Sequence, residues 1–139
     1  SPCHNAARTS AGSDSSGIRG SHGSIYPHIL VRKFENSAVP ATTYVPDDYA
    51  LCFGCHNVNT LFGGDNTKFK QHKTHVSTHT QKDRCVYCHD PHGSPYNLGM
   101  INFDLRVVSK NGSNPIQYLP PVTSKKSCVL VCHGVVHGP

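Results

Sequence analysis

Two copies of one pattern, Cys-x-x-Cys-His, occur among the 7 cysteines and 11 histidines of the chain. They are Cys52-Phe53-Gly54-Cys55-His56 and Cys85-Val86-Tyr87-Cys88-His89. Two thiols three positions apart can each form a thioether with a vinyl group on one side of a porphyrin, and the imidazole of the next residue then lies under the iron. The pattern therefore predicts two sites of covalent c-type haem attachment.

Two further stretches carry variants of this pattern. Cys128 and Cys132, followed by His133, have one extra residue between the thiols, which a slightly wider loop can absorb. Cys3-His4 matches the end of a fourth copy, whose first cysteine we expect just before Ser1. We therefore predict four haems. Their thioethers would come from Cys3, Cys52, Cys55, Cys85, Cys88, Cys128 and Cys132, and their first iron ligands from His4, His56, His89 and His133.

The remaining histidines are candidates for the second ligand of each iron. His72 and His75 lie three positions apart, on one face of a helix predicted to begin at Asp65 or Asn66 and to run to about Val76. His92 follows His89 too closely to reach the far face of the same haem, so it would serve a neighbouring haem or bond near a propionate. The candidates for four places are His22, His28, His72, His75, His79, His92 and His137. The alternative for each is a solvated imidazole.

Cysteine and histidine clusters also build zinc sites, and cysteines of exported chains also form disulfides. Disulfides do not require a histidine directly after every second cysteine. Zinc would need two Cys-x-x-Cys pairs, or one pair with two histidines, without the strict Cys-His step. Haem attachment explains both features.

The composition favours a fold that is built around cofactors. Of the 139 residues 36% are apolar and 8% aromatic, and there is no tryptophan, which is a poor supply for a side-chain core. We predict a mostly irregular, loop-rich chain in which the haems act as the core, with short helices around the haem sites and one small β-hairpin. The chain would be a single domain, with a loose N-terminal arm over 1–45, a central haem pair over 46–93 and a hairpin with the last haem site over 94–139.

Local signals place the predicted elements. Pro46 with two acidic residues behind it predicts a short helix that runs into Cys52. Asn111-Gly112 between β-prone runs at 102–108 and 115–119 predicts the hairpin. Thr123 or Ser124 would cap a last short helix that ends at Cys132.

The charge and hydropathy of the chain limit its partners. The formal net charge is +5, but each ferric haem with ionised propionates adds about −1, so four haems would leave about +1. We therefore predict no nucleic-acid partner. No stretch approaches the 18 apolar residues of a membrane helix. The first residues are not a signal peptide, yet covalent haem is attached outside the cytoplasmic membrane, so we expect a removed export signal upstream.

The residues between and after the motifs carry a resemblance to a known family. They are Leu51 to His56, Phe69 with His72 and His75-Val76, Cys88-His89-Asp90-Pro91-His92-Gly93-Ser94, Ile101-Asn102-Phe103-Asp104, and Cys132-His133-Gly134 with His137. Over about residues 49–138 the chain resembles the doubled Cys-x-x-Cys-His multihaem c-type cytochromes of metal-reducing bacteria. It resembles most the tetrahaem outer-surface cytochromes, some of which polymerise into filaments with a continuous haem chain. It departs from them at its start, where the first cysteine is absent.

The resemblance and the ligand count together predict electron transfer through four bis-histidine haems, without catalysis of bond chemistry and without catalytic residues. We expect a protein at the outer cell surface or outside the cell, with the periplasm as the alternative. Its partners would be redox proteins or extracellular acceptors and further copies of itself, joined head to tail when His22 or His28 ligates a neighbour's iron. The alternative function is a multihaem reductase of a small oxyanion with one open haem site.

Overall fold

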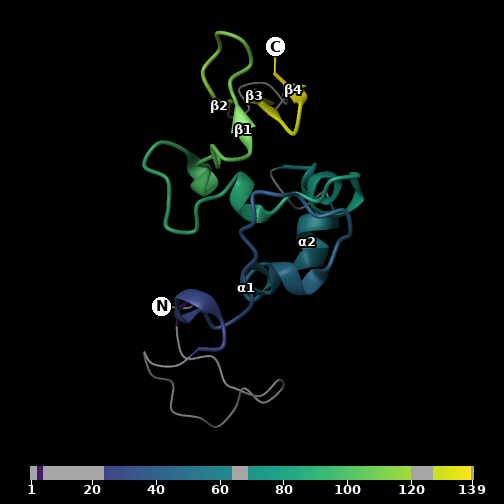
Figure 1. Ribbon diagram of the computed structural model, residues 1–139, viewed down its shortest axis with the longest axis vertical. Coiled ribbons are helices and arrows are strands. Elements are labelled where there is room, and N and C mark those ends of the chain that lie inside the picture. The colour runs from purple at the N-terminus through teal and green to yellow at the C-terminus, as the bar shows by residue number, and fades with distance from the viewer. Residues whose placement is uncertain (1–2, 5–23, 64–68, 120–126, 139) are drawn as a thin grey trace. The chain divides into compact units, whose positions relative to one another are not determined.

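The computed structural model describes residues 3–4, 24–63, 69–119 and 127–138. The chain forms two compact units, one from Ser1–Glu35 with Tyr44–Lys73 and the other from Asn36–Thr43 with Thr74–Pro139. The single domain that we predicted, with its parts 1–45, 46–93 and 94–139, stays a prediction. The described helices and strands are short and joined by long irregular segments (Figure 1). The loop-rich character thus agrees with the prediction.

In the first unit a helical stretch leads into the first Cys-x-x-Cys-His motif. A 3-10 turn, η2 (Pro46–Tyr49), continues into α1 (Ala50–Phe53). Pro46 stands at the start of the turn, where its missing N–H costs nothing, and the Asp48 carboxylate accepts a 2.7 Å hydrogen bond from the Nζ of Lys33. The helix predicted to run from Pro46 into Cys52 is confirmed.

A second helix of this unit, α2 (Val58–Gly63), was not predicted. The side-chain oxygen of Asn57 accepts hydrogen bonds from the backbone N–H groups of Asn59 and Thr60, at 2.9 and 3.2 Å, which is the geometry of an N-terminal cap. Aromatic rings join this helix to the turn before it: their centroids lie 5.5 to 6.3 Å apart in the pairs Tyr44–Tyr49, Tyr44–Phe62, Tyr49–Phe53 and Phe53–Phe62. At the centre of this ring cluster, Tyr49 is 2% exposed.

The second unit contains a four-stranded antiparallel sheet built on β3 (Ser127–Cys132). β1 (Val108–Ser109) pairs with the end of β3, and β2 (Gln117–Leu119) pairs with its beginning. β4 (Val135–His137) follows β3 and pairs back onto it, with Cys132 opposite Val135. Val129 and Leu130 at the centre of β3 are 2% and 3% exposed. β3 is therefore the strand that holds the sheet together (Figure 1).

Two predictions for this region are wrong. The runs on either side of Asn111-Gly112 do not pair with each other. Their strands, β1 and β2, both pair with β3, because the apolar side chains of β3 provide a surface that these strands can bury. The segment that ends at Cys132 is a strand and not a helix. Its apolar residues suit a strand with several partners. β1 and β2 precede this strand in the sequence, and β4 follows it directly.

The helix predicted from Asp65 or Asn66 begins outside the described residues. Within them, the chain forms a π-helical turn, η3 (Thr74–Thr78), in which the N–H of His79 donates to the carbonyl of Thr74 at 2.8 Å. The unit boundary falls between Lys73 and Thr74, so His72 belongs to the first unit and His75 to the second.

Tyr87 is the most deeply buried side chain of the second unit. It is 1% exposed, and its hydroxyl donates a 2.7 Å hydrogen bond to the carbonyl of Ser37. It lies in the 3-10 turn η4 (Cys85–Tyr87), inside the second Cys-x-x-Cys-His motif. This burial anchors the motif in the unit. Among the described residues there is no helix with the length and apolar character needed to cross a bilayer.

Candidate functional site

Each of the two Cys-x-x-Cys-His motifs forms a helical turn with the same hydrogen-bond pattern, although the motifs lie in different units. The N–H of His56 donates to the carbonyl of Cys52 at 2.9 Å, and the N–H of His89 donates to the carbonyl of Cys85, also at 2.9 Å. The second cysteine of each motif donates to the same carbonyl, at 3.1 and 3.3 Å. Such a helical turn places side chains three and four positions apart on one side. Each motif therefore presents two thiols and an imidazole in one direction.

All seven cysteines lie in the described residues, and all are thiols that form no disulfide. Burial strongly raises the pKa of the Cys88 thiol, with Cys128 adding to the effect, and burial raises the pKa of Cys132 to about 11. These thiols are neutral at pH 7. A neutral S–H can add across the C=C bond of a vinyl group without any oxidant, since sulfur bonds to one carbon and hydrogen to the other.

Two of the histidines that follow a cysteine are held through Nδ1. The Nδ1 atom of His89 lies 2.7 Å from the carbonyl oxygen of Gly99, and that of His4 lies 2.8 Å from the carbonyl oxygen of His28. Because a carbonyl only accepts, Nδ1 must carry the proton in both rings, and the lone pair is then on Nε2. A backbone bond of this kind is the usual outer support of a metal-binding histidine. His56, which also follows a cysteine, is exposed, as is His4, whereas His89 is half-buried.

The third motif has a different geometry. Cys128 and Cys132 lie on one extended strand, β3, and four residues of strand span about 13 Å. Side chains three apart on a helical turn are only about 5 to 6 Å apart. The slightly wider loop that we predicted is therefore not formed, and this pair of thiols does not match the arrangement at the other two motifs.

His133 lies in the tight turn between β3 and β4. His133 and Gly134 have φ of 49° and 79°, as both central residues of a two-residue type I′ hairpin turn require. Its ring packs against Tyr87, with centroids 5.6 Å apart, and its Nε2 lies 3.1 Å from Oδ1 of Asp83. The ring atom that would bind iron is thus in contact with a carboxylate.

Asp83 is the centre of a second possible ligand set. One ligand atom each from Asp83, Cys132 and His133 lies within 4.8 Å of the others, the one such set found among the described residues. Burial raises the pKa of Asp83, while the neighbouring imidazoles, first His133 and then His75 and His79, lower it. Thiol, imidazole and carboxylate together are donors that zinc accepts. Sequence reasoning missed Asp83, because nothing in its spacing connects it with a histidine 50 positions later.

The candidate second ligands are scattered in the structure. His75 and His137 lie together, with ring centroids 6.2 Å apart, and burial followed by His75 lowers the pKa of His137. His72 packs edge-on against Phe69 at 5.2 Å. His92 is an exposed side chain, 3.5 Å from the Asp90 carboxylate. His28 and His79 are exposed, and His22 lies outside the described residues.

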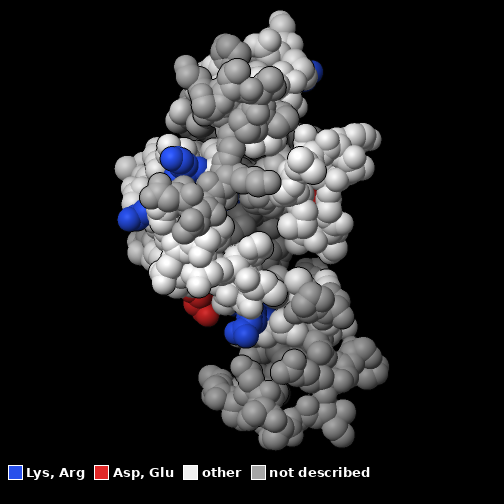
Figure 2. All heavy atoms as spheres, turned by 180° about the vertical axis from the view of Figure 1, so that it is seen from behind, with Lys and Arg blue, Asp and Glu red and all other residues white. Residues whose placement is uncertain are grey.

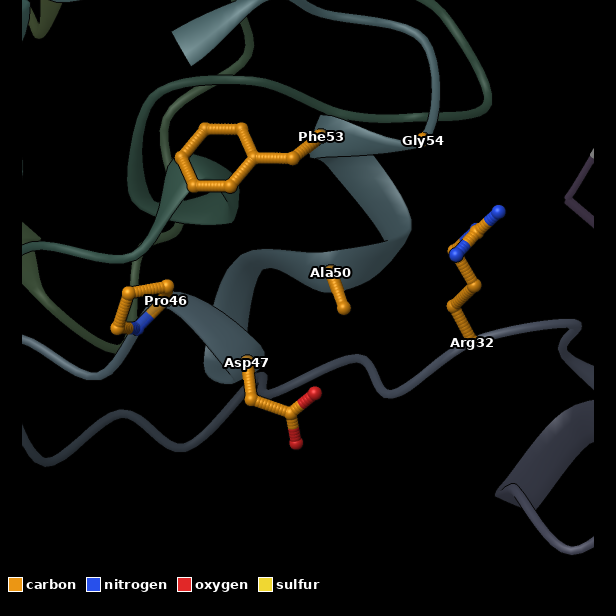
Figure 3. A pocket seen from close by; sticks show the side chains of 6 residues that line it. All are labelled: Arg32, Pro46, Asp47, Ala50, Phe53 and Gly54. Carbon is orange, nitrogen blue, oxygen red and sulfur yellow. The ribbon is translucent and has the colours of Figure 1, made fainter. Parts of the chain in front are cut away.

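A hollow of about 410 Å³ lies beside the first motif, lined by Arg32, Pro46, Asp47, Ala50, Phe53 and Gly54. Figure 3 shows the Arg32 side chain rising toward Gly54. A methyl group at Gly54 would meet the Nε of Arg32 at 3.0 Å, so the absence of a side chain there lets the guanidinium approach. Arg32 thus places a cation at the wall of this hollow, where it could pair with a carboxylate such as a propionate.

One face of the molecule shows how its described cations are distributed. On the face in Figure 2, blue side chains stand apart from one another, with no continuous basic patch over its described residues. An electrostatic footprint for nucleic acid would need clustered lysines and arginines. The absence of a nucleic-acid partner stays a prediction.

In comparisons with known proteins, no family model, no curated protein and no solved structure matches this chain. The functional argument therefore depends on the residues and the geometry described above.

Proposed function

We propose that this chain is a multihaem c-type cytochrome that transfers electrons. The observation that carries the proposal is the segment Cys85–His89, where a helical turn presents two thiols and a histidine whose Nδ1 is held by the Gly99 carbonyl. The donor set suits covalent haem, because thiols at this spacing match two vinyl groups and Nε2 is left with its lone pair. The turn at Cys52–His56 repeats the backbone geometry.

The residues of the chain would perform three tasks. The cysteines bind the porphyrin edge, the histidine after each pair binds the iron from one side, and a second histidine binds from the other side. Haem iron, when bound in this way, supplies a reversible one-electron couple between Fe(III) and Fe(II). If an imidazole held the iron on each side, no position would remain for a substrate, and for that reason we propose no enzymatic activity.

The location and the partners of the protein are further parts of the proposal. Haem attachment takes place outside the cytoplasmic membrane, so we propose an exported protein at the outer surface or outside the cell, with the periplasm as the alternative. There it would exchange electrons with redox proteins or extracellular acceptors, and copies joined head to tail would form a filament.

Optical titration tests the electron-transfer proposal. The purified full chain, titrated with dithionite, should show low-spin spectra in both states and should not change when CO is added to the reduced form. A CO-induced shift that corresponds to one whole haem would favour the oxyanion reductase, which needs an open iron.

Zinc binding is the second candidate function, and the ligand set of Asp83, Cys132 and His133 is the specific observation that favours it. It predicts a protein that is purified without haem and binds one zinc ion tightly. Cobalt(II) is the probe, because a thiolate ligand gives a charge-transfer band that disappears in Cys132→Ser. A haem-loaded protein without this band would reject the candidate.

A further inference from the structure

Two short turns in the two units have the same unusual backbone. Turn η1 (Pro27–Ile29) contains His28 at φ 61° and ψ 23°, followed by Ile29 at φ 56°. Turn η5 (Leu98–Met100) contains Gly99 at φ 71° and ψ 21°, followed by Met100 at φ 57°. Left-handed backbone is uncommon outside glycine and is a genuine outlier for a β-branched residue such as Ile29. Its occurrence twice in succession, in both turns, needs a reason.

The reason lies in what each turn contacts. The carbonyl of the first left-handed residue accepts the Nδ1 hydrogen of a histidine that follows a cysteine: His28 for His4 at 2.8 Å, and Gly99 for His89 at 2.7 Å. Strained backbone persists where the surrounding structure fixes it, commonly at functional sites. In both units the strain coincides with support of a candidate iron ligand.

The bonds around each turn match as well. After the first turn, Leu30 forms an isolated β-bridge with His4. The N–H of Val31 donates a hydrogen bond to the Cys3 carbonyl at 3.0 Å. After the second turn, Ile101 forms an isolated β-bridge with His89. The N–H of Asn102 donates a hydrogen bond to the Cys88 carbonyl, also at 3.0 Å. Both bridges are antiparallel. The turn and the Cys-His pair therefore form one structural module in each unit.

The residues that precede each turn also form matching hydrogen bonds. Ser24 accepts a hydrogen bond from the N–H of Tyr26 at 3.0 Å, and Ser94 accepts one from the N–H of Tyr96 at 3.4 Å. The carbonyl after each turn accepts a side-chain hydrogen bond, from Ser24 in one module and from Asn97 in the other. In the sequence both stretches read His-Gly-Ser-x-Tyr, at 22–26 and at 92–96.

We propose, on the basis of the proposed function, that these are two copies of one device that orients an iron-binding histidine through a left-handed carbonyl. His28 is then a positioning residue for His4 through its backbone, as Gly99 is for His89, and it is not an iron ligand. At Gly99 the carbonyl bond to His89 forms although glycine has no side chain. The imidazole of His28 is therefore not needed for the equivalent bond to His4. The His28 carbonyl also lies at the Nδ1 end of the His4 ring, at the opposite end from the Nε2 that would bind iron.

The device would act on the electronic properties of the iron. A hydrogen bond from Nδ1 to a carbonyl fixes the tautomer and makes the ligating nitrogen more basic. A more basic ligand favours the ferric state, so loss of this bond raises the midpoint potential of the haem concerned. A merely structural turn would leave the potentials unchanged.

Substitutions in the haem-loaded full chain test the proposal. His28→Gly keeps the carbonyl and tolerates the left-handed backbone, so all potentials and the absence of CO binding should be those of the unaltered protein. His28→Pro and Gly99→Pro cannot adopt positive φ and should each raise the potential of a different haem. His28→Gly with one CO-binding haem would overturn the proposal, as would proline variants with unchanged potentials.

A measurement on the unaltered protein covers the case in which a proline variant does not fold. In the reduced, diamagnetic protein, the Nδ1 protons of His4 and His89 should exchange slowly with solvent, and His28→Gly should preserve this protection. Fast exchange at both rings would overturn the device. A protein that carries no covalent haem at all would instead reject the proposed function, so the two failures are distinct.

Discussion

The Nε2 atom of His133 lies 3.1 Å from Oδ1 of Asp83, although the two residues are 50 positions apart. Both side chains are only 13% exposed, so the contact is shielded from water. In a haem site this Nε2 binds iron and Asp83 has to release it, whereas in a zinc site both residues bind the metal. A haem site therefore requires that Asp83 leaves His133, whereas a zinc site requires that both residues stay together on the metal.

We expect Asp83→Ala to keep the same covalent haem content as the unaltered protein, because a carboxylate takes no part in thioether formation. Denaturing mass spectrometry of both proteins measures this content. The same substitution would weaken a zinc site at least about tenfold by removing one donor. Asp104→Ala is the control, since that side chain is also 13% exposed but pairs with Arg106. Loss of haem in Asp83→Ala alone would contradict our assignment.

Asn57→Ala should lower stability by about 1 kcal/mol, because the N–H groups of Asn59 and Thr60 lose their cap. A denaturant midpoint that decreases in the variant, with an unchanged haem spectrum, is the expected result. Asn59→Ala is the matched control: it lies within the helix, where alanine is favourable. Equal midpoints for the two variants would show that the cap does not stabilise α2.

Tyr87→Phe should cost about 1 to 2 kcal/mol, because it leaves the Ser37 carbonyl without its 2.7 Å donor in a buried position. Thermal melting followed by circular dichroism gives the comparison. Tyr96→Phe serves as the control, since Tyr96 is 90% exposed and its hydroxyl lies at the surface. A Tyr87→Phe melt that coincides with that of the control would contradict the role given to this bond.

Much of the first unit could be predicted from local signals, and much of the second could not. Pro46 with its acidic neighbours specifies a helix start by itself, so the helix before Cys52 was found. The strand that ends at Cys132 depends on partners at 108–109 and 117–119, which no local pattern indicates, and on 135–137, which the following turn brings back. The His133-Gly134 pair was interpreted as a helix end, although the same residues suit a type I′ hairpin turn.

The candidate site likewise has one part that could be predicted from the sequence and one part that could not. The Cys-His motifs and their helical turns follow from spacing within five residues. The carbonyl partners of His4 and His89 are backbone atoms, which carry no residue type to recognise. Asp83 reaches His133 only through the tertiary fold.

Acid should destabilise the protein partly through Asp104. Hydrogen bonds from the Arg106 side chain lower the pKa of this carboxyl below its ordinary 3.8. A lowered folded-state pKa contributes stability that is present above pH 3.8 and is lost as the pH falls through the folded-state value. Asp104→Asn should therefore melt with a weaker pH dependence below pH 4 than the unaltered protein. Parallel curves for the two proteins across that window would contradict this expectation.

The most direct test of the account is the mass of the full chain, produced with export and haem attachment and measured under denaturing conditions. The polypeptide has a mass of 15.1 kDa. Four covalent haems add about 2.5 kDa, and Cys85→Ser with Cys88→Ser should remove one haem equivalent. A mass equal to that of the polypeptide alone would contradict the account.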